Sequence, residues 1–157
     1  MSTFSKAEEI YAIVDTVIDF PVWEIEEAAD NVVVLHFDEL IKNSAGAVVG
    51  KRRLWLQNTW RIQTSDTILG ACTGMNPDPQ YLEAIQHIQD KRLTEITVIE
   101  RSLDTIFHFE DDLKIYVYNA HLEGPSAHAA WKFFYPQGNI LQVGPGANYS
   151  IDNHSGR

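Results

Sequence analysis

Two stretches of this sequence repeat one pattern, and the repetition constrains the fold more than any other feature. An aromatic strand beginning at Trp131 leads through a Pro-x-Gly turn to the apolar segment 139–146, which ends in Gly-Pro-Gly. A similar strand beginning at Trp60 leads through a polar turn to a second apolar segment that also ends in glycine. We therefore predict internal repeats at 5–74 and 78–149, with the two tryptophans in equivalent, partly buried positions.

The repetition extends upstream of the two tryptophans. Leu35 to Leu40 and Phe107 to Leu113 share a His-Phe pair followed by an acidic turn. The predicted fold class is α+β, with two units of a helix plus an antiparallel β-meander related by pseudo-twofold symmetry and with the helices packed on the sheet. Further matched pairs are Asp19 with Asp90, Glu24 with Glu95, and Ile25 with Ile96.

Capping signals and apolar periodicity predict the elements of each unit. The Ser5 and Glu8 capping box precedes apolar residues at helical spacing and predicts a helix over residues 6–18. The Asn-Pro-Asp-Pro sequence at 76–79 sets up a second helix that reaches about Lys91. Alternating apolar residues predict strands at 22–27, 32–38, 52–57, 59–64, 67–72, 93–100, 105–110, 113–119, 129–135 and 139–143.

Composition favours one compact, acidic domain. The chain has 157 residues, of which 45% are hydrophobic, enough for a core in a single domain covering 1–157. Acidic residues outnumber basic ones 22 to 12, and the net charge of −10 opposes attraction to nucleic acid or anionic membranes. A basic protein partner or a neutral small ligand fits better. With no leader and no long apolar run, we predict a cytoplasmic protein with no membrane segment.

Other residues carry weak signals for cofactors. Cys72 is the only cysteine and is predicted to be a small buried hydrophobe. The segment 46–51 has two glycines and a lysine, but its spacing does not match a phosphate loop, and we expect no nucleotide cofactor. The basic run 51–53, near Trp55 and Trp60, is interpreted as an edge strand protected from pairing rather than as a nucleic-acid surface.

Two His-carboxylate pairs have the spacing that places both side chains on one face of a strand. These pairs are His36 with Asp38 and His108 with Glu110. Such pairs could form a metal or acid-base site, and a solvated strand face explains the same alternation. We favour the solvated face and predict no metal site.

His121 and His128 flank a loop that contains a Gly-Pro pair. These two histidines could join His108 at a pocket, because loops over a rigid sheet commonly carry function. This possibility gives the alternative function, a small-ligand-binding protein or an enzyme with a pocket near His108, His121 and His128. The oligomeric state has no signal in the sequence.

Two acidic runs are the candidate partner-binding residues. Neither run belongs to a complete nucleophile, acid-base or metal motif, so we predict a role in binding rather than catalysis. Carboxylates exposed on a rigid scaffold attract a basic protein and speed its encounter. The predicted partner-binding residues are Glu24, Glu26, Glu27, Glu110, Asp111 and Asp112.

The second half of the chain also resembles a known group of proteins. The resemblance rests on Phe107-His108-Phe109 with its acidic turn, on Trp131, and on the Pro136-Gln137-Gly138 turn into the segment 140–146. In these features the chain looks like small, acidic bacterial α+β proteins, some of which are similar to immunity proteins of polymorphic toxin systems. The resemblance implies a protein-binding inhibitor, and it transfers no catalytic residue.

Overall fold

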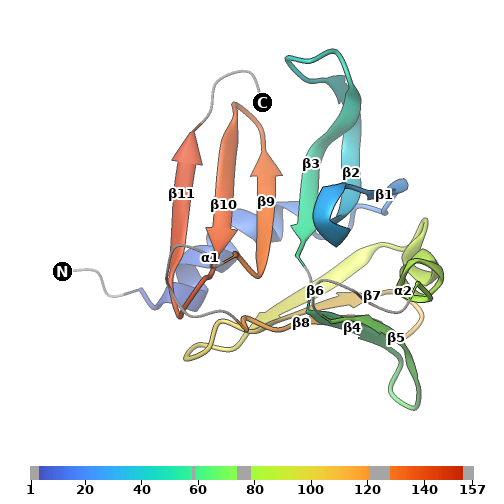
Figure 1. Cartoon of the computed structure of the whole chain (residues 1–157). Coiled ribbons are helices and arrows are strands. Elements are labelled where there is room, and N and C mark those ends of the chain that lie inside the picture. Colours follow the sequence, from blue (N-terminus) through green and yellow to red (C-terminus); the bar gives the residue numbers. More distant parts are fainter. Residues whose placement is uncertain (1–3, 58, 74–78, 121–127, 154–157) are drawn as a thin grey trace.

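Antiparallel β-sheet dominates the computed structural model, which describes residues 4–57, 59–73, 79–120 and 128–153 (Figure 1). One sheet has the strand order β1-β2-β3-β9-β10-β11, and the other has the order β5-β4-β8-β7-β6. The six-stranded sheet stands upright in Figure 1, and the five-stranded sheet crosses below it. The strands are β1 Glu24–Glu27, β2 Val33–Lys42, β3 Val48–Leu56, β4 Trp60–Gln63, β5 Ile68–Cys72, β6 Leu93–Val98, β7 Thr105–Phe109, β8 Leu113–Val117, β9 Trp131–Tyr135, β10 Asn139–Val143 and β11 Tyr149–Asn153.

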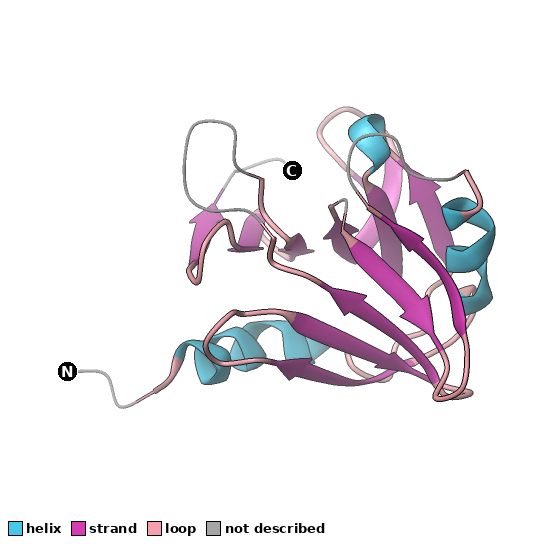
Figure 2. Ribbon diagram, turned by 60° about the horizontal axis from the view of Figure 1, so that its bottom comes forward, coloured by secondary structure: helices cyan, strands magenta, loops and turns pink. Residues whose placement is uncertain are grey.

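The helices are short and lie at the periphery of the strands (Figure 2). Helix α1, Lys6–Val14, begins at Ser5, whose hydroxyl oxygen accepts the Glu8 N–H at 3.2 Å, as the capping box predicts. Helix α2, Tyr81–Ile85, packs closely on β5, because a Cβ added at Gly70 would lie 2.5 Å from the Ala84 Cβ. Three short 3-10 helices complete the described helical segments: η1 Asp15–Val17, η2 Ala29–Asn31 and η3 Gln86–Ile88.

Each sheet buries one face in a common core. Along the strands buried side chains alternate with more exposed ones, which is the period that a half-buried strand requires. Trp60 and Trp131 are both fully buried, so the prediction that they are partly buried is wrong. The indole N–H of Trp131 donates to the Thr105 hydroxyl at 2.9 Å, whereas Trp60 packs edge-on against Tyr81. Cys72 is buried, as predicted.

The predicted α+β fold of separate helix-plus-meander units is wrong. The described residues form mainly strands, and they contain only two short α-helices. The strands of each half of the sequence are also divided between the two sheets. β3 pairs with β9 in one sheet, and β4 pairs with β8 in the other. After β3 the chain crosses from one sheet to the other, and local periodicity carries no information about such a crossing. Each sheet therefore combines strands from both halves.

The segments before β1 and β6 are joined by reciprocal hydrogen bonds. The Asp19 N–H donates to the Leu93 carbonyl, and the Asp90 N–H donates to the Val22 carbonyl, each at 2.7 Å. Pro21 forms an isolated bridge with Arg92 at the centre of this contact. The contact ties the two sheets together at one end. The internal repeats at 5–74 and 78–149 remain a prediction from the sequence.

Candidate functional site

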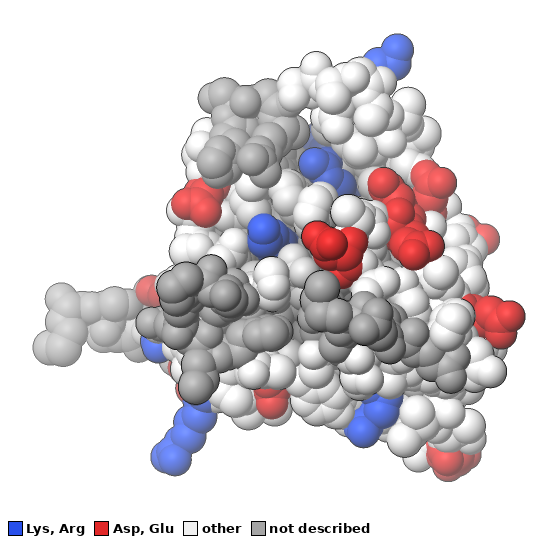
Figure 3. All heavy atoms as spheres, viewed as in Figure 1, with Lys and Arg blue, Asp and Glu red and all other residues white. Residues whose placement is uncertain are grey.

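An acidic strand forms one edge of the six-stranded sheet. Among the residues that the structure describes, strand β1 pairs only with β2, and Glu24, Glu26 and Glu27 are exposed on it. Figure 3 shows carboxylates gathered in the part of the surface where Figure 1 draws β1 and η2. We call these three residues the acidic edge. Charged side chains on an edge strand leave its backbone accessible while opposing indiscriminate pairing.

His36 holds part of the acidic edge from beneath. Its imidazole is 1% exposed, and its Nδ1 accepts the Gly50 N–H at 3.0 Å. The proton must then be on Nε2, which donates to the Glu26 carboxylate at 2.7 Å. The Trp23 ring packs against the His36 ring, with 5.3 Å between the two centroids. A buried, neutral histidine therefore orients a carboxylate whose side chain remains 52% exposed.

The sequence favoured a solvated strand face for His36 and Asp38, and this prediction is wrong for His36, which is buried. The alternative, a site formed by His36 with Asp38, does not occur either. A β-bulge interrupts the register of β2 after Phe37, and Asp38 adopts a positive φ of 64°. The Asp38 carboxylate instead forms an ion pair with Arg52. Within the described ranges, no group of three or more His, Cys, Asp and Glu residues has the geometry to hold a metal ion.

An open groove lies beside the acidic edge. Phe20, Pro21 and Trp23 form its apolar part, and Asp38 and Glu39 form its acidic part. The indole N–H of Trp23 donates to the Asp38 carbonyl at 2.9 Å, which fixes the ring in place. This groove was not predictable from local sequence patterns, because its two sides come from segments before and after β1.

The second acidic run serves the fold. Glu110 accepts the Arg92 N–H at 2.7 Å, and Asp111 forms an ion pair with Lys91. Asp112 accepts both the N–H and the hydroxyl of Ser65 at 2.7 Å, and these bonds lower the pKa of Asp112 below its ordinary value. The run lies in the turn between β7 and β8 of the five-stranded sheet. It therefore does not continue the acidic edge.

The predicted histidine pocket is described only in part. His108 is half-buried on β7, its Nε2 lies 3.0 Å from the Thr97 hydroxyl, and burial lowers its pKa. His128 is exposed, and His121 lies outside the described residues. The structure does not show these three side chains in one site. The pair of His108 with Glu110 also fails to form a site, because the Glu110 carboxylate accepts a hydrogen bond from the Arg92 backbone N–H.

A cationic and aromatic cluster occupies the centre of the outer face of the six-stranded sheet. Arg53 stands opposite Phe134, and Trp55 stands opposite Lys132, on the adjacent strands β3 and β9. The Arg53 guanidinium lies 4.7 Å from the Phe134 ring centroid, and the Lys132 ammonium lies 5.9 Å from the Trp55 ring. Figure 3 shows basic atoms in this central region, to the left of the carboxylates gathered near β1.

The interpretation of the basic run 51–53 as an edge strand is therefore wrong. Strand β3 lies between β2 and β9 in the interior of the sheet. The sequence showed the cationic and aromatic alternation, but only the long-range pairing with β9 brings Lys132 and Phe134 beside it.

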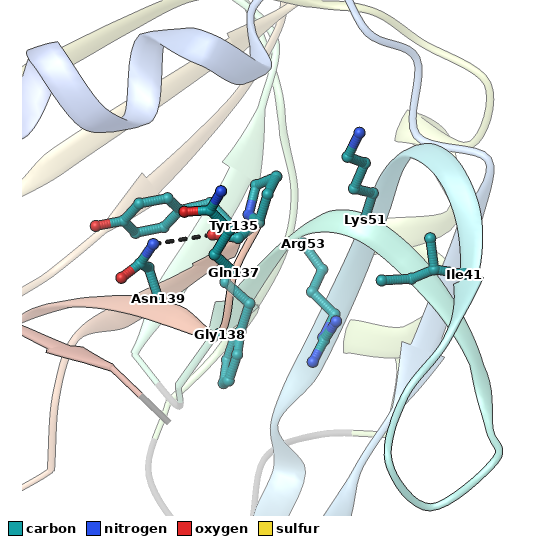
Figure 4. Close-up of a pocket in the computed structure, with 9 residues that line it drawn as sticks. Ile41, Lys51, Arg53, Tyr135, Gln137, Gly138 and Asn139 are labelled. Atoms are coloured by element: carbon teal, nitrogen blue, oxygen red, sulfur yellow. Dashed lines mark hydrogen bonds between the residues drawn. The ribbon is translucent and has the colours of Figure 1, made fainter. Parts of the chain in front are cut away.

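A small cavity adjoins this cluster at the β9–β10 turn (Figure 4). Arg53 and Ile41 lie on one side of it, and the turn lies on the other. The Asn139 amide donates to the Pro136 carbonyl at 2.9 Å and closes the turn. The described lining residues are Ile41, Lys51, Arg53, Phe134, Tyr135, Pro136, Gln137, Gly138 and Asn139.

Comparisons of the chain with protein-family models, with curated proteins and with solved structures found no match. No helix among the described residues is long and apolar enough to span a membrane.

Proposed function

We propose that this chain is a non-catalytic, protein-binding protein of the inhibitor or immunity type, and that it captures a basic partner at the acidic edge. The observation that supports this proposal is the position of Glu24, Glu26 and Glu27 on an exposed edge strand. Carboxylates in that position face solvent, and they stand beside a groove with an apolar floor. A cytoplasmic setting, as the sequence predicts, suits such a role.

Charge complementarity accounts for the choice of partner. The net charge of −10 attracts a basic protein over a distance, and this attraction raises the association rate. The same charge opposes binding to nucleic-acid phosphates. The proposal therefore names a basic protein surface and no nucleic-acid partner.

The edge and the groove together supply short-range contacts. An extended basic segment could pair through main-chain hydrogen bonds with the side of β1 that no described strand covers. A lysine or arginine of the same segment could lay its aliphatic stem on Trp23 and Phe20, with its charged end toward Glu39. Glu39 suits this contact because its side chain is 75% exposed.

Affinity capture tests the proposal. The wild-type chain and the E24K/E27K variant are immobilised and exposed to an extract of the source cells, and retained proteins are identified by mass spectrometry. The control is D66K/D152K, which changes the net charge equally at exposed positions on β11 and in the β4–β5 turn. We expect a basic protein that the wild type and the control retain and that E24K/E27K loses. Retention by all three baits, or retention of acidic proteins alone, would contradict the proposal.

A further inference from the structure

A groove of about 440 Å³ opens between helix α1 and strand β6, and we call it the β6 groove. Tyr11, Asp15 and Ile18 form the side contributed by α1 and the segment after it, and residues 94–97 of β6 form the other side. Strand β6 is the last strand in the order of the five-stranded sheet. The β6 groove therefore contains part of a sheet edge, where backbone groups are accessible to a ligand.

The backbone of β6 faces strand β7 and the groove alternately. The Ile99 N–H donates to the Asp104 carbonyl at 2.8 Å in the β6–β7 hairpin, so the odd-numbered residues at this end of β6 bond to β7. The even-numbered residues point their backbone groups the other way, and the Val98 N–H accordingly donates to the Tyr11 hydroxyl at 2.7 Å. The N–H and the carbonyl of Ile96 face the same direction as those of Val98.

Ile96 is the open position on this edge. On one side of it the Val98 N–H is already bonded, and on the other side Leu93 is bonded through both its N–H and its carbonyl to residues 19–20. Within the described residues, no group bonds to the outward N–H or carbonyl of Ile96. An opening one residue long does not admit a passing strand, but it admits the first residue of one.

The charge of the β6 groove selects a cation. Asp15 and Glu95 line it, and none of its described lining residues is basic. Asp15 is also the C-cap of α1, whose last turn contains no basic residue to offset the negative end of the helix dipole. The surrounding chain desolvates the Asp15 carboxylate and raises its pKa above the ordinary value. A bound ammonium group offsets both effects.

We propose that the β6 groove binds the amino-terminal residue of a peptide. The carbonyl oxygen of that residue accepts the Ile96 N–H, and its ammonium donates one hydrogen to the Ile96 carbonyl and the others to Asp15 and Glu95. An adjacent antiparallel strand exchanges the same two backbone hydrogen bonds with one residue. Strand β6 and the acidic edge belong to different sheets, so this site does not depend on the function proposed for that edge.

Titration of the isolated protein with three small molecules tests the site. Alaninamide has both the ammonium and the carbonyl, N-acetylalaninamide lacks the charge, and methylammonium lacks the carbonyl. The readout is the NMR shift of the Ile96 amide at pH 7, below the pKa of about 7.7–8.0 of an α-amino group. We expect alaninamide to bind about tenfold more tightly than either of the other two. Equal binding of N-acetylalaninamide or of methylammonium would overturn the proposal.

A comparison with alanine separates a peptide terminus from a free amino acid. Alanine keeps the ammonium but carries a carboxylate, which the Asp15 and Glu95 carboxylates of the groove repel. We therefore expect alanine to bind more weakly than alaninamide. Equal or tighter binding of alanine would overturn the assignment to a peptide terminus.

Two variants assign the recognition of the ammonium to Asp15. D15N should weaken alaninamide binding about tenfold, whereas E8Q should leave it unchanged. Glu8 is a matched control, because it is an exposed carboxylate in the first turn of the same helix, away from the β6 groove. Asp15 is exposed, so D15N should fold as the wild type does, and urea unfolding checks this. Unchanged binding in D15N, or an equal loss in both variants, would overturn the proposal.

The acidic-edge variant E24K/E27K shows whether the two sites are separate. It should bind alaninamide as the wild type does, because β1 lies in the other sheet. A loss of alaninamide binding equal to that in D15N would overturn the assignment of a separate site, whatever the acidic edge itself binds.

Discussion

His36 and His108 occupy similar sequence contexts, each followed by phenylalanine and an acidic turn, but they have different surroundings. His36 is 1% exposed and uses both ring nitrogens, one toward Gly50 and one toward Glu26. His108 is half-buried, and its Nε2 lies near the Thr97 hydroxyl. The same two-residue pattern therefore produces an interior support in one sheet and a peripheral contact in the other.

The acidic residues near these histidines differ in the same way. Near His36 the carboxylates of the acidic edge point outward, and Glu26 is held in an exposed position. Near His108 the turn carboxylates accept hydrogen bonds from the backbone of Arg92 and Ser65. The comparison shows that equal local charge can serve binding in one place and folding in another.

Removing each histidine should give the largest difference between the two regions. H36A leaves the Gly50 N–H without its buried acceptor and opens a cavity, so we expect a loss of about 3 kcal/mol in the free energy of unfolding. H108A should cost less than about 1 kcal/mol, because its side chain is half-buried and its described contact is with one hydroxyl. Urea unfolding measures both values. Equal losses would show that the two positions are alike.

The two core tryptophans should differ by a smaller amount. W131F removes the hydrogen bond to Thr105 as well as buried surface, and we expect it to cost about 2 kcal/mol. W60F should cost about 1 kcal/mol, because the Trp60 N–H is buried with no hydrogen-bond partner in the described part of the chain. Thermal and urea unfolding of both variants provide the measurement. A larger cost for W60F would contradict the packing described for it.

The pH dependence of stability should report His108. Burial lowers the pKa of His108 below its ordinary 6.5, so the unfolded chain binds a proton more readily than the folded one. The stabilisation is complete above pH 6.5 and is lost as the pH falls from there through the lowered folded pKa. Across this window the free energy of unfolding should fall more steeply with decreasing pH in wild type than in H108Q. Parallel curves would contradict the lowered pKa.

Asp112 should act in a lower pH window. Its hydrogen bonds from Ser65 lower its pKa below the ordinary 3.8, so its stabilisation is present above that value and is lost as the pH falls through the folded pKa. D112N should flatten the acid limb of the stability profile relative to E24Q. An unchanged acid limb in D112N would show that the Ser65 contact contributes nothing measurable.

Neutralising the acidic edge should have the smallest effect on folding. Glu24 is exposed on an edge strand, so E24Q should change the free energy of unfolding by less than about 0.5 kcal/mol. Urea unfolding of E24Q beside wild type checks this value. A larger loss would assign Glu24 to the fold rather than to binding.

Local elements were predictable from the sequence because they depend on local chemistry. The Ser5 cap is a contact over three residues, and the strands at 139–143 and 131–135 coincide with short apolar runs. Strand pairing was not predictable, because β3 meets β9 across a long stretch of chain that includes another sheet's strands. The sequence predicts a local meander at the point where the chain crosses from one sheet to the other.

The candidate sites also combine features that local sequence predicts with features that depend on long-range strand pairing. The exposed carboxylates of β1 could be identified from their run of charge, but their position on a sheet edge depends on the strand order. The structural use of Asp112 depends on Ser65, which is 47 residues away. Arg53 gave a visible basic signal, yet its burial against Phe134 comes only from the β3–β9 pairing.

The rate at which the captured basic partner associates with the chain tests the central claim most directly. Stopped-flow association is measured over a range of salt concentrations for wild type, E24K/E27K and the charge-matched control D66K/D152K. Salt screens such attraction, with a Debye length of about 8 Å at physiological ionic strength. We predict that E24K/E27K slows association far more than the control and removes most of its salt dependence. Equal slowing in both variants would show that net charge alone attracts the partner and would contradict a binding role for the acidic edge.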